Sequence, residues 1–351
     1  MQLQTLLKKI KPVNDTAYTA CLEHFDGVAK PVGSLGRLET LLARIAAVYA
    51  DENIELDKKC VLVFCADNGV VAEGVAQSGA DVTTAIAEMM AAGKSSVCVM
   101  AKACGAQVFV VDVGMRDTVK GLLNRKLAQG TGNIATGPAM SRKMATAAIE
   151  LGAELSRQRR AEGFRLIATG EAGIGNTTTA SAMASVLLGS TVVEVTGRGA
   201  GLTDEGLARK RAAIERAITQ NHPDPEDPLD ILCKLGGLDI AAMTGAFLGG
   251  AAYGVPVVMD GMISAVAALC AVRLEPRVHG YIIPSHVSAE PAGRLLCEAL
   301  GLEPVLHADM RLGEGTGAVA LFPLLDMAAT VYHRAATFAE IAVDVYKRNP
   351  C

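Results

Sequence analysis

The sequence predicts an α/β protein built on a mainly parallel sheet flanked by helices. Two observations carry this prediction: short apolar runs alternate with longer Ala-rich stretches of helical pattern, and most runs are continuously apolar rather than alternating with polar residues. Strands of that kind are typical of a sheet covered on both faces. The 351 residues, 50% apolar and 20% charged, can bury a sizeable core in one large domain or two modest ones.

Six apolar runs are predicted to be strands. They span residues 59–67, 106–114, 164–171, 191–197, 255–261 and 277–286. Ala-rich segments such as 83–93 and 177–189 are predicted to be helices between some of these strands. The Pro-rich stretch 221–230 is expected to be a loop between helices.

The apolar stretch 240–272 is long enough to raise the question of a membrane span. Gly254-Val255-Pro256 interrupts it, and it contains Asp260. We therefore predict a helix, a turn, a buried strand and a second helix here, and no association with a membrane.

Charge and cysteine usage exclude several classes of protein. The formal net charge is −4 with both signs spread along the chain, so no nucleic-acid partner is expected, and the basic run 157–160 is predicted to be the solvated end of a helix. The nine cysteines show no Cys-x-x-Cys pair and no metal-ligand spacing, which suits a reducing cytoplasm and predicts no metal. The first 15 residues lack the features of a signal peptide, so a cytoplasmic protein is expected.

Polar or glycine residues end nearly every predicted strand. Because ligands of open parallel sheets bind beyond the carboxyl ends of the strands, these clusters are expected to converge on one edge. Ordinary strand-to-helix turns and helix caps favour the same residue types and are the alternative for any one cluster. The clusters are 67–69, 112–114, 170–171, 197–199, 260–261 and 285–286.

Two glycine-rich segments could carry chemistry. Residues 170–179 lie between a predicted strand and a helix, where glycines and helix-start amides could cradle a phosphate or sugar phosphate. This segment has neither the Walker pattern nor the dinucleotide fingerprint. Residues 311–318 place Glu314 between two glycines, where its carboxylate could reach a ligand. The alternative is a helix start with a glutamate near the positive end of the helix dipole.

Seven motifs, in order and covering roughly residues 30 to 330, resemble those of the nicotinate-nucleotide–dimethylbenzimidazole phosphoribosyltransferase family, which makes the lower ligand of cobamides. Each motif is weak alone, and their order makes the resemblance specific. They are KPVGSLGRLE (30–39), GEAGIGNTTTAS (170–181), GRGAGLTDEGLARK (197–210), GGLDIAAMTGA (236–246), VPVVMDGMISAVAAL (255–269), PSHVSAEPAG (284–293) and RLGEGTGAVALFPLLDMA (311–328).

The resemblance implies an architecture and a reaction. The architecture is a large Rossmann-like catalytic domain, 51–324, and a small helical domain built from 1–50 and 325–351, in a homodimer or a heterodimer with a close paralogue. The family transfers phosphoribose from nicotinate mononucleotide to 5,6-dimethylbenzimidazole without a cofactor, releasing nicotinate and an α-riboside phosphate.

The resemblance also implies roles for particular residues. Glu314 is the catalytic residue, a general base for the acceptor. Residues expected to bind the phosphate and ribose are Glu171, Gly173, Gly175, Asn176, Thr177, Thr178, Lys210, Asp260, Gly261, Ser285, Gly313 and Gly315. Residues expected to line the base pocket are Asn68, Ser78, Ile86 and Leu312.

The sequence departs from the family pattern near the acceptor. Asn68 stands where the family has histidine, and Ile86 stands where it has glutamine; residues 78–81 also lack the usual proline pattern. Loss of hydrogen-bonding groups changes which base a site prefers, so a phenol or an unusual benzimidazole is a possible acceptor, and neutral drift is the alternative.

Two other functions share these features. An NAD-dependent dehydrogenase would share the fold, but the dinucleotide fingerprint is missing. A catalytically idle subunit could support a paralogous enzyme, but Glu314 is intact.

Overall fold

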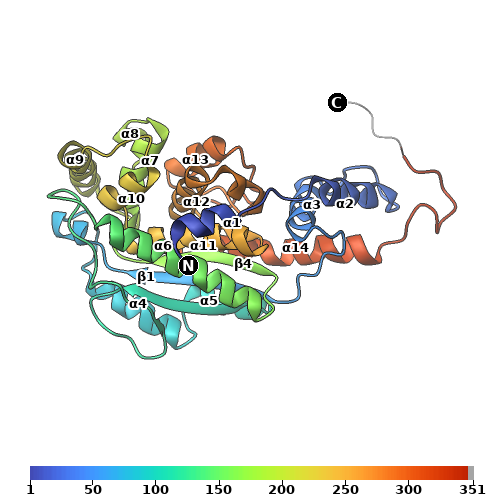
Figure 1. Cartoon of the computed structure of the whole chain (residues 1–351), viewed down its shortest axis with the longest axis horizontal. Coiled ribbons are helices and arrows are strands. Elements are labelled where there is room, and N and C mark those ends of the chain that lie inside the picture. Colours follow the sequence, from blue (N-terminus) through green and yellow to red (C-terminus); the bar gives the residue numbers. More distant parts are fainter. Residues whose placement is uncertain (347–351) are drawn as a thin grey trace.

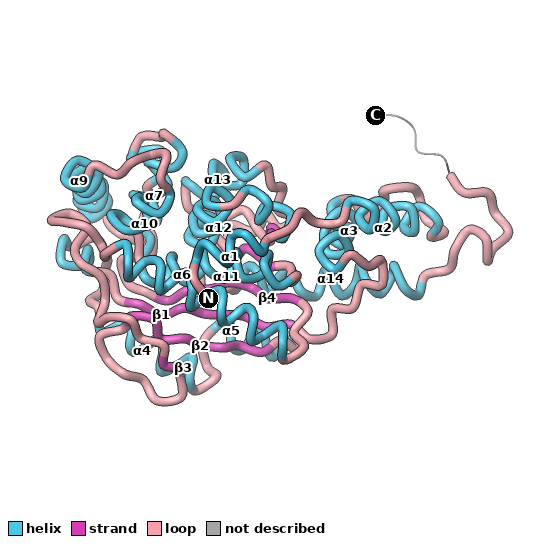
Figure 2. The backbone as a smooth tube through the Cα atoms, in the orientation of Figure 1, coloured by secondary structure: helices cyan, strands magenta, loops and turns pink. Residues whose placement is uncertain are grey.

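A computed structural model describes residues 1–346 and contains a six-stranded sheet. Its strand order is β3-β2-β1-β4-β5-β6, and every neighbouring pair is parallel, so the predicted α/β class is confirmed (Figure 2). The strands are β1 (Lys59–Ala66), β2 (Gln107–Gly114), β3 (Leu123–Asn124), β4 (Leu166–Ala172), β5 (Val257–Met259) and β6 (Ile282–Pro284).

Fourteen α-helices and two 3₁₀ helices lie among the described residues. The α-helices are α1 (Leu3–Lys9), α2 (Asp15–Gly27), α3 (Arg37–Tyr49), α4 (Asp81–Ala91), α5 (Ser96–Ala103), α6 (Arg142–Ala161), α7 (Asn176–Leu188), α8 (Val192–Val195), α9 (Asp204–Asn221), α10 (Pro228–Leu235), α11 (Leu238–Tyr253), α12 (Met262–Leu274), α13 (Ala292–Leu300) and α14 (Thr316–Arg334). The 3₁₀ helices are η1 (Gly69–Glu73) and η2 (Pro276–Tyr281).

Five of the six predicted strands are confirmed, although residues 277–281 of the last one belong to the 3₁₀ helix η2, and the strand predicted at 191–197 is wrong. That segment contains the short helix α8, which begins with a capping box: the Thr191 hydroxyl accepts from the Glu194 N–H, and the Glu194 carboxylate accepts from the Thr191 N–H. Val192 and Val195 are three residues apart and both buried, which suits one face of a helix. Strand β3 has two residues and was not predicted.

The predictions for the other ambiguous segments are confirmed. Helix α11, a turn, strand β5 and helix α12 occupy the apolar stretch 240–272, and residues 222–227 connect α9 to α10 within the predicted loop. The basic run 157–160 falls in the last turns of α6, although Arg159 is buried because its guanidinium stacks over Phe109 and pairs with Glu162. None of the helices formed by residues 1–346 combines the length and hydropathy needed to cross a membrane.

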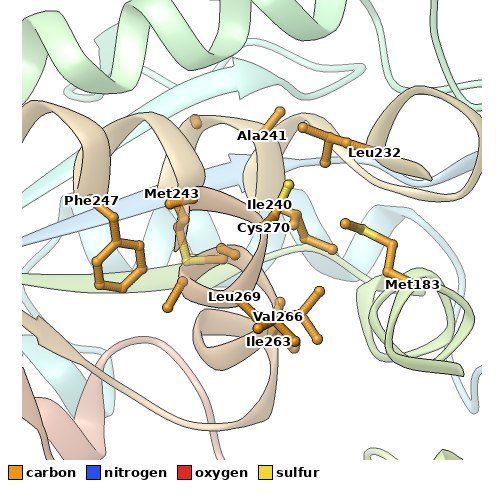
Figure 3. Close-up of a cluster of buried hydrophobic side chains, with 14 of the residues drawn as sticks. Met183, Leu232, Ile240, Ala241, Met243, Phe247, Ile263, Val266, Leu269 and Cys270 are labelled. Atoms are coloured by element: carbon orange, nitrogen blue, oxygen red, sulfur yellow. The ribbon is translucent and has the colours of Figure 1, made fainter. Parts of the chain in front are cut away.

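The sheet is covered on both faces. Side chains of β1 alternate between two apolar clusters: Leu62 and Phe64 belong to one, and Val61 and Val63 to the other. The first cluster includes α6, α7, α10, α11 and α12. Figure 3 shows part of it, with Ile240 and Met243 of α11 and Val266 and Cys270 of α12 among its side chains. The second includes α3, α4, α5 and α14.

Close packing of α11 on α6 explains the glycines in this region. A Cβ at Gly152 of α6 would collide with the carbonyl oxygen of Ala242, and a Cβ at Gly245 of α11 would collide with that of Ile149. Only glycine permits the two backbones to approach so closely.

The helices near the two ends of the chain pack in two different places. Helices α2 and α3 and the end of α14 lie together at one side of the molecule (Figure 1), where Phe25 meets Tyr332 with ring centroids 5.0 Å apart. Helix α1 instead packs against α6 and α11. The division into 1–50 plus 325–351 and 51–324 stays a prediction.

Candidate active site

A cavity lies beyond the carboxyl ends of β4, β5 and β6. Its cavity volume is about 210 Å³. Six segments contribute to its walls, and they are far apart in the sequence. They are 75–86, 171–177, 198–202, 260–264, 286–290 and 311–314.

The loop before α14 has an unusual backbone. Gly313, Glu314 and Gly315 all have positive φ, at 88°, 62° and 90°. The left-handed region is strained for a glutamate, so this conformation is one that neighbouring structure must hold in place. Gly170 of β4 lies against the loop, because a Cβ there would collide with the Glu314 carbonyl oxygen.

Glu314 lines the cavity and is half-buried. Its Oε2 accepts a hydrogen bond from the Val97 N–H at the start of α5, at 3.3 Å. Burial raises the pKa of Glu314, the Val97 hydrogen bond opposes the rise, and the negative charge of Asp260 adds to it. A carboxylate of raised pKa on a cavity wall is suited to accept a proton.

Asp260 follows β5 and is buried under the same loop. Its Oδ2 accepts from the Gly315 N–H at 3.2 Å, and its Oδ1 accepts from the Ala318 N–H at 3.0 Å. The His286 Nδ1 lies 3.9 Å from Oδ1. Burial raises the pKa of Asp260, and the charge of His286 and the backbone amides oppose the rise. Both carboxylate oxygens of Asp260 therefore accept hydrogen bonds from the N-terminal end of α14.

The loop between β4 and α7 forms another wall. Gly175 has φ +91°, and a Cβ there would lie 2.8 Å from the Val71 Cγ2, so both its conformation and its surroundings require glycine. The Ile174 N–H donates to the Thr83 hydroxyl of α4 at 3.1 Å, which fixes the loop against that helix. The N-terminus of α7 consequently faces the cavity through Gly173, Gly175, Asn176 and Thr177.

A buried polar network supports this loop. The Asn176 side-chain amide donates to the Glu171 carboxylate and, at 3.0 Å, to the Asp239 Oδ2. Burial raises the pKa of Glu171 well above its usual range, and the negative charge of Asp239 adds to the rise. Burial also raises the pKa of Asp239, to about 6. These surroundings favour the neutral form of Glu171.

Lys210 lies behind the 197–199 loop. Its Nζ donates to the Thr177 hydroxyl at 2.9 Å and to the Gly197 carbonyl at 3.1 Å, and burial lowers its pKa to about 8. Opposite it, the Glu290 Oε1 accepts from the Gly199 N–H at 3.1 Å. Lys210 and Glu290 therefore hold the loop from two sides.

The predicted base pocket is partly assembled. Ser78, Ile86 and Leu312 line the cavity, and the Leu312 side chain is 56% exposed, so a ligand can reach it. Asn68 does not belong to the walls: it is buried beneath the 173–175 loop, with its Nδ2 3.5 Å from the Ile174 carbonyl oxygen.

Most of the other predicted site residues reach the cavity. Glu171, Gly173, Gly175, Asn176, Thr177, Asp260, Gly261, Gly313 and Glu314 line it. Four lie just behind its walls: Thr178, Lys210, Ser285 and Gly315. Ser285 donates to the Met259 carbonyl oxygen at 2.6 Å, which ties the ends of β5 and β6 together.

The convergence of strand ends is only partly as predicted. The ends of β4, β5 and β6 meet at the cavity, and the 197–199 cluster also reaches it, although it follows a helix. Asp67 and Asp112 instead hold neighbouring turns, by accepting from the Arg116 N–H at 2.7 Å and the Met115 N–H at 2.9 Å. These two clusters are structural turns, which was the alternative for each.

The walls also carry polar residues to which the sequence analysis gave no individual role, among them Arg198, His286, Ser288 and Glu290. All four lie within the motifs 197–210 and 284–293. The motifs could therefore have pointed to these residues, although the chemistry of each residue alone did not. Among residues 1–346, no group of three or more His, Cys, Asp or Glu side chains is arranged to hold a metal ion.

The fold and the site define a phosphoribosyltransferase: a family model with the description "Phosphoribosyltransferase" matches residues 10–343. The nicotinate-nucleotide–dimethylbenzimidazole phosphoribosyltransferase of Acetivibrio thermocellus is 44% identical over 349 residues, 99% of each chain. That of Escherichia coli is 44% identical over 334 residues, 94% of this chain and 93% of its own. The chain belongs to the nicotinate-nucleotide–dimethylbenzimidazole phosphoribosyltransferase family.

A solved structure agrees with this assignment. The crystal structure of CobT from Thermus thermophilus superposes with a TM-score of 0.89 at 40% identity, covering 94% of this chain and 99% of that one. The resemblance drawn from the seven motifs is thus confirmed. The alternatives of a dehydrogenase and of an idle subunit are not favoured.

Proposed function

We propose that this chain transfers the phosphoribosyl group of nicotinate mononucleotide to an aromatic base, with Glu314 as the general base. The observation that carries the proposal is the position of the Glu314 carboxylate, on the wall of a cavity between glycine-rich loops, with a raised pKa. The names of the relatives supply the substrates. The family's activity serves synthesis of the cobalamin lower ligand.

The proposed step balances without a cofactor. The bond from the ribose C1′ to the nicotinate nitrogen breaks, and its electron pair neutralises the pyridinium, so nicotinate leaves without an acid. The acceptor atom bonds to C1′ from the opposite face, which inverts the β anomer to α. Glu314 takes the proton that the acceptor loses, which is the role of a general base.

The phosphate has candidate partners at the start of α7. Backbone amides at a helix N-terminus attract anions, and residues 173–177 line the cavity there. An ammonium has three donors, and two of those on Lys210 are already used, for Thr177 and Gly197. We assign the third to the phosphate, directly or through water. Arg198 also lines the adjoining wall, with its guanidinium paired to Asp204.

The acceptor site supports a wider choice of base. Ile86 lines the cavity and offers no hydrogen bond to a ring nitrogen. A phenol carries a proton that Glu314 could remove in the same way, giving an O-linked α-riboside. We therefore propose that phenols or unusual benzimidazoles are accepted as well as 5,6-dimethylbenzimidazole. Of the two substituted positions, only Ile86 can contact the base, because Asn68 lies beneath the loop.

The test is to incubate the purified protein with nicotinate mononucleotide and equal concentrations of dimethylbenzimidazole and a phenol, and to weigh the products by mass spectrometry. A riboside phosphate and free nicotinate are expected. Glu314→Gln should lower turnover by about 10²–10⁴, the usual contribution of a general base. Near-normal turnover of this variant would remove Glu314 from the mechanism, and exclusive benzimidazole product would restrict the acceptor.

We also propose that the chain works as a dimer, with a second copy or a close paralogue, in the cytoplasm. Apolar side chains that are 45–55% exposed gather in the segment after α14, at Ile341, Val343, Val345 and Tyr346, which suits an interface. The eight cysteines among the described residues are all free, as is usual in a reducing compartment.

A further inference from the structure

The strained loop 313–315 has to be held, and the structure offers few groups that hold it. Glu314 is the non-glycine residue between two left-handed glycines. Such a conformation persists only when its surroundings over-determine it. Gly170 of β4 is in close contact with the loop. Because glycine has no side chain, this contact cannot orient the Glu314 carboxylate through a side-chain hydrogen bond.

Two groups from other elements bond to this loop: the Val97 N–H of α5, which donates to the Glu314 carboxylate, and, at the loop's backbone, Asp260. It lies at the end of β5 and is 3% exposed, and its two oxygens accept from two amides, those of Gly315 and Ala318. The first amide follows Glu314 directly, and the second lies in the first turn of α14. This arrangement is an N-cap supplied from outside the helix, by a charged acceptor.

The neighbours of Asp260 fix it in turn. The Ser264 hydroxyl accepts from the Asp260 N–H at 3.2 Å, and the His286 ring lies beside Oδ1 and fills the space above Gly317. A Cβ at Gly317 would collide with that ring. Asp260 also contributes to the cavity wall, but both of its carboxylate oxygens are already bonded to the N-terminus of α14.

We infer that Asp260 is a positioning residue, which acts on the reaction by holding the Gly313–Gly315 loop so that the Glu314 carboxylate faces the acceptor. This replaces the direct phosphate or ribose contact expected for Asp260, and it rests on the proposed role of Glu314. The inference makes Asp260 act through Glu314, so its effect should depend on Glu314 being present.

A double-mutant cycle tests this dependence. Turnover at saturating substrates is measured for the wild type, Asp260→Asn, Glu314→Gln and the double variant. Asparagine has nearly the same shape as aspartate, but its NH₂ group would face one of the two backbone N–H groups and cannot accept from it. One of the two hydrogen bonds to Asp260 is therefore lost. Asp260→Asn should lower kcat by about 10- to 100-fold, since displacing a catalytic group by about 1 Å has effects of that size. In the Glu314→Gln background the same change should matter by no more than about twofold, the usual error of additivity.

Two controls keep the result interpretable. Asp227→Asn removes a charged cap from α10, where Asp227 accepts from the Leu229 and Asp230 amides at 3.0 and 3.2 Å, and it should leave kcat unchanged. Thermal unfolding shows whether each variant is folded. If Asp260→Asn does not fold, Asp260→Ser enters the same cycle, because a shorter hydroxyl still accepts at a helix start without overfilling the space.

The outcomes separate the two ideas. If Asp260→Asn lowers kcat by the same factor with and without Glu314, the positioning role is overturned. A substrate contact of Asp260, or a general structural effect, would lower kcat independently of Glu314 in this way. Near-normal kcat of Glu314→Gln alone would instead overturn the proposed general base. A large loss of kcat in Asp260→Asn that disappears in the Glu314→Gln background supports both the positioning role of Asp260 and the role of Glu314 as general base.

Discussion

At the scale of single residues, the basicity of Glu314 reflects opposing influences. Burial raises its pKa and the charge of Asp260 adds to the rise, whereas the Val97 N–H stabilises the ionised form. The buried carboxyl group of Glu171 also lines the cavity, and the charge of Glu314 contributes to the rise in the pKa of Glu171. A general base works only when ionised, so turnover should fall as the pH drops through a value above that of an ordinary glutamate.

Removal of the Val97 hydrogen bond tests this balance. Val97 is the second residue of α5, where proline is tolerated because the first-turn N–H has no partner in its own helix. Val97→Pro deletes the N–H, which should raise the pKa of Glu314 further and move the acid limb of kcat/KM to higher pH. Val97→Ala is the matched control, because it also loses the valine side chain but keeps the N–H. Superimposable acid limbs for the two variants would show that the hydrogen bond does not tune Glu314.

At the scale of elements, the turn from β4 into α7 joins the sheet to the proposed phosphate site. Its glycines are fixed by different constraints: Gly173 packs against the Ala66 carbonyl oxygen, and Gly175 needs a left-handed backbone. The helix that follows begins at Asn176, whose side chain ties the turn to Glu171 and Asp239. The same residues thus shape the cavity and begin the helix.

Gly175→Val should therefore weaken binding of nicotinate mononucleotide at least tenfold while changing binding of the free base much less. A β-branched residue at a left-handed position costs about 1–2 kcal/mol, and here it also meets Val71. Calorimetry with each ligand measures the difference. Gly189→Val is the control: it has φ +63° at the far end of α7 but open space around it, so it should lower stability without selecting between ligands. Equal losses for both ligands in Gly175→Val would make the turn purely structural.

At the scale of the whole molecule, α14 connects the site to the outlying helices. It begins directly after the Glu314 loop and ends beside α2 and α3, where Tyr332 packs on Phe25 (Figure 1). With 19 residues it is roughly 28 Å long. A partner that binds the outlying helices would thus lie at the far end of the helix that begins at the Glu314 loop.

The proposed dimer can be tested on that segment. Val343→Ser combined with Val345→Ser removes two exposed apolar side chains and should raise the dimer dissociation constant by about tenfold or more, given roughly 1 kcal/mol for each partly buried valine. Light scattering over a dilution series gives the mass. Val193→Ser on α8 is the control, because this valine is 55% exposed but lies elsewhere. A monomeric wild-type protein would rule out a homodimer, and an unchanged mass in the double variant would place the interface elsewhere.

Local sequence patterns were sufficient to predict most strands of the sheet, the glycine-rich loops and the family. Continuous apolar runs predicted five strands correctly, because strands covered on both faces need no polar alternation. Glycines marked both glycine-rich loops that line the cavity, since a left-handed backbone or a close approach leaves few other choices of residue. The motif order identified the family and singled out Glu314, although its catalytic role is still a proposal.

The tertiary structure decided what depends on neighbours distant in the chain. Val192 and Val195 suit a strand or a helix equally until a capping box and a shared buried face select the helix. Asp260 ends a strand, as expected of a ligand contact, yet its oxygens meet α14, which lies 55 residues or more further on. The sequence determines which polar groups lie at the strand ends, but the partner of each buried group is set by whatever donor or acceptor the fold brings within about 3 Å.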